Sequence, residues 1–158
     1  MLEAAQWQPL VLGPDEVPSW RSAQSSVALD NPVGLLLYGG QVAEKQASNE
    51  LWLWPIDDEY FTQMCPGLDS PSRLLHGSFF LPSSGLLYIA GGQFFQNRSE
   101  WIFQININMC TWSYVSASGA PEPMSNFAHG LVTVGGEPVF AIYGGTYNND
   151  TQYSTAFW

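Results

Sequence analysis

The amino-acid sequence predicts an all-β fold that is built from a repeated unit. The 158-residue chain contains 15 glycines and 11 prolines, and it has no long stretch with the 3.6-residue periodicity of an amphipathic helix. Three apolar segments end in paired glycines, spaced 52 and 53 residues apart: Gly39-Gly40, Gly91-Gly92 and Gly144-Gly145. A constant spacing of this length is typical of repeat proteins. With 46% apolar residues, the chain is long enough for one domain with a hydrophobic core.

The segments before the glycine pairs share one pattern. They read GLLLYGG from Gly34, GLLYIAGG from Gly85 and PVFAIYGG from Pro138. Apolar residues at successive positions predict strands that are buried on both faces. A glycine pair, which has no Cβ atoms, lets such a strand end close to its neighbours and adopt backbone angles closed to other residues.

Further landmarks recur at matching distances from the second glycine of each pair. Sixteen residues earlier the chain has Gln24, His76 and His129, and three residues before these it has Arg21, Arg73 and Asn126. Aromatic residues that open a strand recur at Trp7, Tyr60 and Trp112, and a further aromatic segment (ELWLWPI, EWIFQINI, STAFW) follows each glycine pair. These landmarks predict four strands per repeat, in one domain over residues 1–158, with repeats at about 7–58, 59–110 and 111–158.

This pattern resembles the kelch repeat, and the resemblance covers almost the whole chain from Trp7 to Trp158. It implies kelch-type β-propeller blades, which are four-stranded antiparallel sheets packed radially, in three units that begin with the outer strand. Large aromatic side chains are then expected between adjacent blades. The chain departs from the pattern at Gln24, where histidine is usual, at Asn126, where arginine is usual, and at Pro55, which interrupts a strand.

Three repeats are too few to close a propeller, which typically has four to eight blades. Two arrangements remain open. Either the remaining blades lie on a longer chain, or two copies form one six-bladed ring in which the Trp7 strand of each copy completes the last blade of the other. An exposed sheet edge favours association of this kind.

The charge balance argues against two classes of partner. Lys and Arg number 4 against 14 Asp and Glu, which gives a net charge of −10. Attraction to nucleic acid or to anionic lipid is therefore unfavourable. No stretch approaches the roughly 18 apolar residues that a membrane span requires.

No pattern in the sequence indicates catalysis. His76 and His129 are the only histidines, and their equal distance from a glycine pair predicts structural roles. The acidic run Asp57, Asp58 and Glu59 lacks the spacing of a calcium loop, and phosphate-binding, serine-hydrolase and zinc-protease motifs do not occur. We therefore expect no catalytic residue, no metal and no cofactor. The alternatives are a carbohydrate-active or metal-dependent propeller enzyme whose remaining site residues lie on other blades, and an architectural subunit of a large assembly.

The resemblance implies a protein-interaction or structural module that binds a protein partner through loops on one propeller face. Carried over position by position, the candidate binding residues are Arg21, Gln41, Arg73, Gln93, Phe94, Thr146 and Tyr147. Arginine beside exposed aromatic residues is typical of a binding hot spot. The two arginines have an alternative role, which is to brace neighbouring blades.

Two features bear on the compartment. Asn97 and Asn149 begin glycosylation sequons at similar positions in their repeats, and they favour an extracellular or cell-surface location over a cytoplasmic one. The two cysteines, Cys65 and Cys110, are expected as unpaired core thiols, because the repeat places them near opposite faces of adjacent blades.

Overall fold

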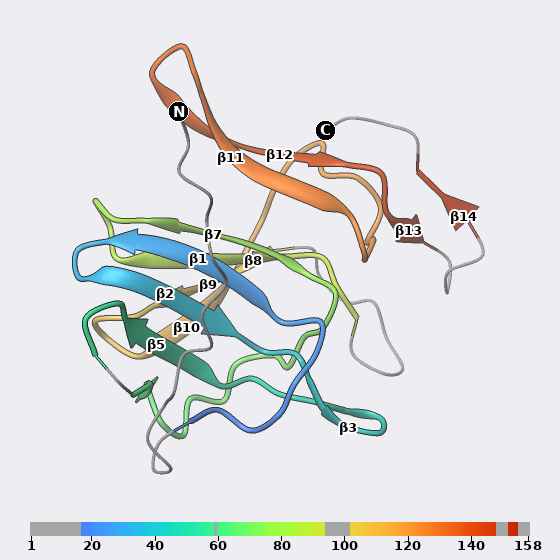
Figure 1. Ribbon diagram of the computed structural model, residues 1–158. Helices are drawn as coiled ribbons and strands as arrows, with labels where there is room; N and C mark the ends of the chain where they lie inside the picture. The colour runs from blue at the N-terminus through green and yellow to red at the C-terminus, as the bar shows by residue number, and fades with distance from the viewer. Residues whose placement is uncertain (1–16, 59, 94–101, 148–151, 155–158) are drawn as a thin grey trace, which may run out of the picture.

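A computed structural model describes residues 17–58, 60–93, 102–147 and 152–154, and the described chain is entirely β-structure and connecting turns, with no helix (Figure 1). All strand pairs are antiparallel. This confirms the predicted all-β class.

Each of two four-stranded sheets is built from one stretch of the chain. Sheet 1 contains β1 (Ser25–Asp30), β2 (Val33–Tyr38), β5 (Leu51–Pro55) and β6 (Thr62–Met64). Sheet 2 contains β7 (Gly77–Leu81), β8 (Leu86–Ala90), β9 (Ile102–Asn106) and β10 (Thr111–Val115).

The remaining strands form two-stranded hairpins. Sheet 3 contains β11 (Ala128–Val134) and β12 (Glu137–Tyr143). Two short hairpins contain β3 (Gln41–Ala43) with β4 (Gln46–Ala47), and β13 (Thr146–Tyr147) with β14 (Gln152–Tyr153).

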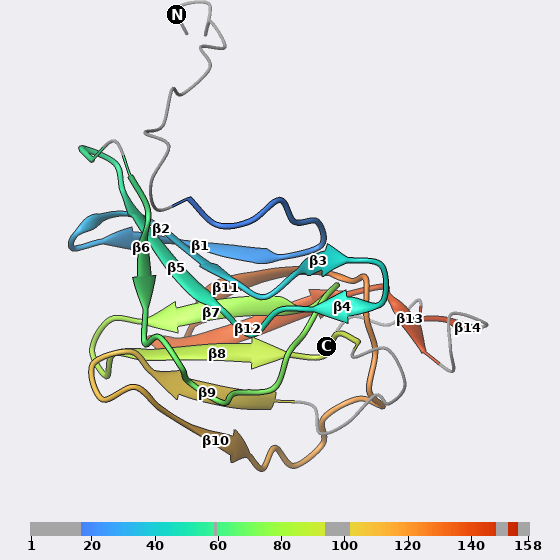
Figure 2. The ribbon, with the colours of Figure 1, turned by 90° about the horizontal axis from the view of Figure 1, so that it is seen from below.

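The three sheets are stacked through their first strands, since β1 contacts β7 and β7 contacts β11 (Figure 2). The main core lies between sheets 1 and 2. It consists of the buried side chains of Leu29, Leu36, Tyr38, Leu51, Leu87, Ile89, Phe103 and Ile105. A second, smaller cluster of Met124, Phe127 and Ile142 lies at the base of sheet 3.

The pairing registers show that the first hairpin of the third repeat is two residues longer than the other two. The base pairs that close these hairpins are Ser25↔Tyr38, Gly77↔Ala90 and Ala128↔Tyr143. The residue just before each base pair is therefore Gln24, His76 and Phe127. The expectation that His129 is the counterpart of His76 is wrong, because counting back from the glycine pair does not allow for the longer hairpin.

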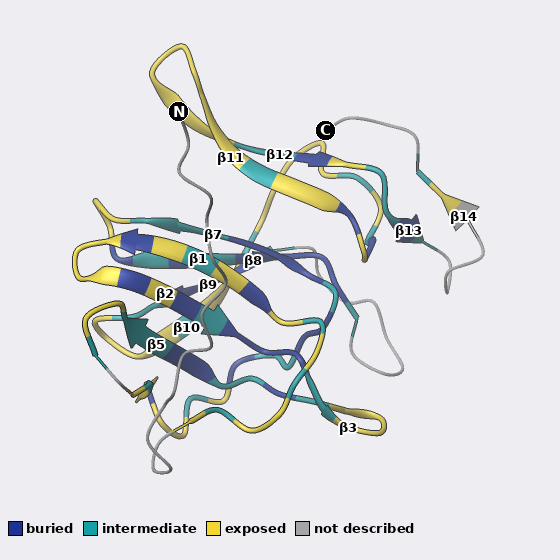
Figure 3. Cartoon of the chain, in the orientation of Figure 1, coloured by how far each residue is buried: buried dark blue, intermediate teal, exposed yellow. Residues whose placement is uncertain are grey.

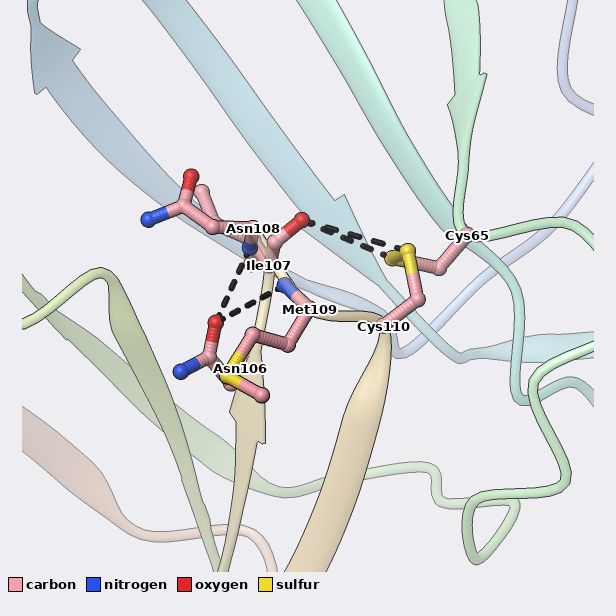
Figure 4. Close-up of a disulfide and its surroundings, with 6 residues drawn as sticks. All are labelled: Cys65, Asn106, Ile107, Asn108, Met109 and Cys110. Atoms are coloured by element: carbon pink, nitrogen blue, oxygen red, sulfur yellow. Dashed lines mark hydrogen bonds between the residues drawn. A yellow bond between two sulfur atoms is a disulfide. The ribbon is translucent and has the colours of Figure 1, made fainter.

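The cysteines correct a second expectation, because Cys65 and Cys110 form a disulfide (Figure 4). Cys65 follows the outer strand of sheet 1, and Cys110 lies in the turn between β9 and β10 of sheet 2. Their Cα atoms are 5.2 Å apart, and both sulfur atoms lie within 4 Å of the carbonyl oxygen of Ile107, at 3.6 and 3.9 Å. The two cysteines meet because the turn that carries Cys110 reaches across to the end of the neighbouring sheet.

The glycine pairs end their strands as predicted, with positive φ at both positions. A Cβ atom on Gly92 would lie 2.7 Å from the carbonyl oxygen of Leu74 and 2.7 Å from Cβ of His76, so a side chain has no room there. A Cβ atom on Gly40 would likewise lie 2.9 Å from the carbonyl oxygen of Ser22 and 2.9 Å from Cβ of Gln24.

We expect Gly92→Ala to destabilise the protein more than Gly67→Ala. Both glycines have a similar positive φ, of 87° and 81°, but a Cβ on Gly67 would meet nothing within 4 Å. The backbone penalty is therefore shared, and overpacking adds about 1–3 kcal/mol to the cost at Gly92. Urea unfolding of the two variants measures the difference, and equal losses would show that the strand end is not tightly packed.

We expect reduction of the disulfide to lower the free energy of unfolding by roughly 4 kcal/mol, since the bond closes a loop between residues 45 positions apart. The comparison is urea unfolding of the oxidised chain, the reduced chain and the double variant Cys65→Ser/Cys110→Ser. Rapid alkylation of the native, unreduced chain at both cysteines would contradict the disulfide.

Candidate functional site

A loop leaves each glycine pair at an equivalent position. Isolated bridges join the residue after the pair to the residue that leads into the first strand of the same repeat: Ser22↔Gln41, Leu74↔Gln93 and Ser125↔Thr146. In the first and third repeats the chain continues into the β3–β4 and β13–β14 hairpins. Both views show β3 and β13 on the same side of the molecule (Figures 1 and 2). We call residues 41–47, 93, 146–147 and 152–153 the loop rim.

The candidate residues of the rim differ in accessibility. The Gln93 side-chain amide donates to Ser125 Oγ at 2.9 Å and so links the second repeat to the third. Thr146 is buried and donates to the Ser125 carbonyl at 3.4 Å. Gln41 is half-buried, and its amide donates to the carbonyl of Ala43 at 3.1 Å. Tyr147 is half-buried.

The rim also has exposed charges that the sequence analysis missed. Glu44 and Lys45 occupy the turn between β3 and β4 and are both exposed, and Lys45 has φ of 56°. A short polar stretch directly after a glycine-pair strand was the available signal. Phe94 and the glycosylation candidates Asn97 and Asn149 lie outside the described residues.

Arg21 holds the first glycine pair in place. Its guanidinium donates to the carbonyl of Gly39 at 3.1 Å and to the Glu50 carboxylate at 2.6 Å. Burial raises the pKa of Glu50, but hydrogen bonds from Arg21 and Trp52 outweigh this effect and leave the pKa below its usual value. The guanidinium is thus engaged within its own repeat.

Arg73 lies between sheets 1 and 2. Arg73 is 3% exposed. Its guanidinium carbon lies 5.6 Å from the centre of the Phe103 ring, within the range of a cation–π contact. Its carbonyl accepts the N–H of Gly40 at 2.8 Å. Burial lowers the pKa of Arg73. This placement favours the bracing role over direct contact with a partner.

The histidines also lie at contacts between sheets. His76 is buried, with Nε2 2.7 Å from Ser25 Oγ of sheet 1 and its ring edge-on to Tyr38. Burial, reinforced by Arg73 and His129, lowers the pKa of His76 to about 3, so the ring is neutral. His129 Nε2 accepts from the backbone N–H of Ser78 in sheet 2 at 3.5 Å.

An apolar cleft of about 280 Å³ lies between sheets 2 and 3. Its lining is Phe79, Ala90, Ile102, Phe140, Ile142 and residues 117–121. Phe79 stacks on Phe140 across it, with ring centres 4.7 Å apart. None of the lining residues carries an ionisable side chain, so the cleft offers packing surface and no acid or base.

Metal-binding clusters and membrane-spanning helices are both absent from the described part of the chain. In the described ranges, no three or more His, Cys, Asp or Glu side chains are grouped so that they could hold a metal ion. The same ranges contain no helix with the length and apolar character needed to cross a membrane. Of the acidic run, Asp57 lies exposed in the turn after β5, and Glu59 lies outside the described residues.

Comparison with known proteins gives one remote similarity. No family model matches the chain. The chain is 22% identical over 148 residues to Tip elongation aberrant protein 1 of Schizosaccharomyces pombe. The match covers 91% of this chain but 13% of that protein, so the chain spans a small part of the length of the relative. This is weak homology that runs along nearly the whole of the chain.

We expect stability to fall as the pH drops below 6.5, in part because of His76. The pKa of His76 is depressed in the folded state, so the unfolded chain binds the additional proton between pH 6.5 and about 3. This loss is on the order of 3 kcal/mol between pH 7 and pH 4. Urea unfolding at several pH values should give a shallower pH dependence for His76→Gln than for the wild type.

His129→Gln is the matched control, because the His129 side chain is exposed whereas His76 is buried. Its pH dependence should stay close to that of the wild type. Equal slopes for the wild type and His76→Gln would show that the ring takes up a proton without unfolding.

Proposed function

We propose that the chain is a segment of a kelch-type β-propeller and acts as a non-catalytic interaction module that binds a protein partner through the loop rim. The observation that carries this proposal is the equivalence of the three bridges at Gln41, Gln93 and Thr146. They start a loop at the same place in each repeat, and at least two of these loops extend on one side of the molecule (Figure 2). Loops that a rigid β scaffold presents together are a common way to build a binding surface.

The chemistry of the rim suits a protein partner. Glu44 and Lys45 provide exposed charges of opposite sign, Gln41 provides an amide, and Tyr147 provides an aromatic ring. Such a mixed polar and aromatic surface matches a protein interface better than a nucleic acid, which would need a surplus of positive charge. The net charge of −10 supports the same conclusion.

The disulfide supports an oxidising location for the module. Disulfides form and persist outside the cytosol, because the cytosol keeps thiols reduced. The Cys65–Cys110 bond therefore favours the extracellular or cell-surface location, and the sequons at Asn97 and Asn149 are consistent with that location. In this proposal both asparagines carry glycans.

A binding screen tests the proposed function. The 158-residue chain, immobilised in its oxidised form, is screened against an array of purified secreted and cell-surface proteins. For a true partner we expect the dissociation constant to rise at least about tenfold when the rim is altered, by Tyr147→Ala or by the pair Glu44→Ala/Lys45→Ala, because interface energy is concentrated in a few side chains.

Met109→Ser is the matched control. Met109 is exposed in the β9–β10 turn, which is not part of the rim. Its affinity should equal that of the wild type. A partner that binds rim variants and wild type equally would place the interface elsewhere, and the absence of any partner on the array would count against the module.

A further inference from the structure

The two outer faces of the three-sheet stack carry exposed apolar side chains. On sheet 3 they lie on the face turned away from sheet 2, which we call the trailing face: Val132, Val134, Val139 and Tyr143. On sheet 1 they lie on the face turned away from sheet 2 or in the segment that leads into β1, which we call the leading face: Trp20, Val33 and Leu35. Figure 3 shows that most of β11 is exposed.

Contacts between successive sheets repeat along the stack. At the first junction Leu75 donates its N–H to the carbonyl of Ala23 at 2.9 Å, and at the second Asn126 donates to the carbonyl of Leu75 at 3.0 Å. The glycine pairs follow the same rule. Gly40 donates to the carbonyl of Arg73, and Gly92 donates to that of Met124, both at 2.8 Å.

The side chains at these junctions also repeat. On every sheet we call the face toward the preceding sheet the leading face, and the face toward the following sheet the trailing face. The trailing face of sheet 1 packs against the leading face of sheet 2 to form the main core. The trailing face of sheet 2 contributes Phe79, which stacks on Phe140 from the leading face of sheet 3. The structure therefore contains two examples of a trailing face covered by a leading face.

The outer faces have the composition of the covered faces but not their burial. The register places Tyr143 at the position of Tyr38 and Val132 at that of Leu29, as counted from the hairpin base. Tyr143 is 54% exposed where Tyr38 is 1%, and Val132 is 46% exposed where Leu29 is 5%.

The same holds on the leading face, where Leu35 corresponds to Leu87. Leu35 is 36% exposed and Leu87 is 1% exposed. Trp20, beside Arg21, is 97% exposed. Exposed apolar surface of this kind marks an interface.

The backbone groups of the junction recur at both outer faces. Among the described residues, the N–H of Gly145 has no acceptor, and the carbonyl of Asn126 receives no hydrogen bond. At the other end, the carbonyl of Arg21 and the N–H of Ala23 are their complements, and they too form no hydrogen bond with a described residue. The donor and the acceptor on the trailing face thus match the acceptor and the donor on the leading face.

We propose that the trailing face of one copy of this chain binds the leading face of a second copy, head to tail, and that two copies close a ring through two such contacts. A second copy is the expected partner because the two existing junctions would continue. The leading face of sheet 1 resembles the leading faces of sheets 2 and 3, which cover the trailing faces of sheets 1 and 2. Val132 and Tyr143 of one copy then pack against Leu35 and Trp20 of the other. The contact does not depend on the loop rim, so it stands or falls separately from partner binding.

Light scattering after size-exclusion chromatography tests the contact. The chain is produced in the bacterial periplasm, so that the disulfide forms without glycosylation. We expect the wild type to have twice the 17.5 kDa mass of one chain. Val132→Asp, on the trailing face, and Leu35→Asp, on the leading face, should each run as monomers, whereas Met109→Asp in the β9–β10 turn should remain a dimer.

Mixing the two monomeric variants distinguishes head-to-tail contact from a symmetric contact between like faces. Val132→Asp retains an intact leading face and Leu35→Asp retains an intact trailing face, so an equimolar mixture should form a one-to-one dimer through one unaltered junction. Neither variant alone can form such a junction. Recovery of dimer on mixing is therefore the specific result that supports the proposal.

Other outcomes overturn it. A monomeric wild type would show that a second copy does not cover these faces, as would be the case if further repeats of a longer chain cover them. Loss of the dimer in only one variant would indicate contact between like faces, and open-ended oligomers would exclude a closed ring. Circular dichroism and a cooperative urea-unfolding transition check folding, and resistance of Cys65 to alkylation checks that the disulfide has formed. Val134→Asp and Val33→Asp replace any variant that fails these checks.

Discussion

The structure depends on the junction between successive sheets, where the end of a glycine-pair strand meets the segment that enters the next repeat. At this point Gly40 donates to the carbonyl of Arg73, and Gly92 donates to that of Met124. The approach is so close that a Cβ on either glycine would collide with the entry segment of its own repeat. The absence of a side chain therefore allows one backbone segment to contact both its own sheet and the next.

The polar side chains of the junctions are buried, and their partners are groups of the neighbouring sheets. Arg73 lies over Phe103, and His76 reaches Ser25 of the preceding sheet in its neutral form. A buried arginine and a neutral buried histidine are stable only while their surroundings remain packed, because an isolated charge in the interior is costly. The same residue types that suggest chemistry in a sequence thus act here as fixed parts of the stack, and the accessible chemistry lies on the rim and on the outer faces.

The disulfide adds a second connection at the periphery. The junctions join the sheets near their first strands, whereas Cys65–Cys110 ties the outer strand of sheet 1 to the β9–β10 turn of sheet 2. Two connections far apart on the same pair of sheets restrict their relative rotation more than either alone. Sheet 3 has no such second link among the described residues, and its exposed trailing face is where we propose that a second copy binds.

The sequence by itself determined the β class, the repeat spacing and the strands that end in glycine pairs, because apolar patterning and glycine placement are local signals. It also determined that Gln41, Gln93 and Thr146 occupy equivalent positions. Only the tertiary structure decided that His129 is not the counterpart of His76, since a two-residue lengthening of a hairpin changes the register without changing the motif. The disulfide and the burial of Arg73 were likewise decided by contacts between sheets, because such contacts join residues that no local pattern relates.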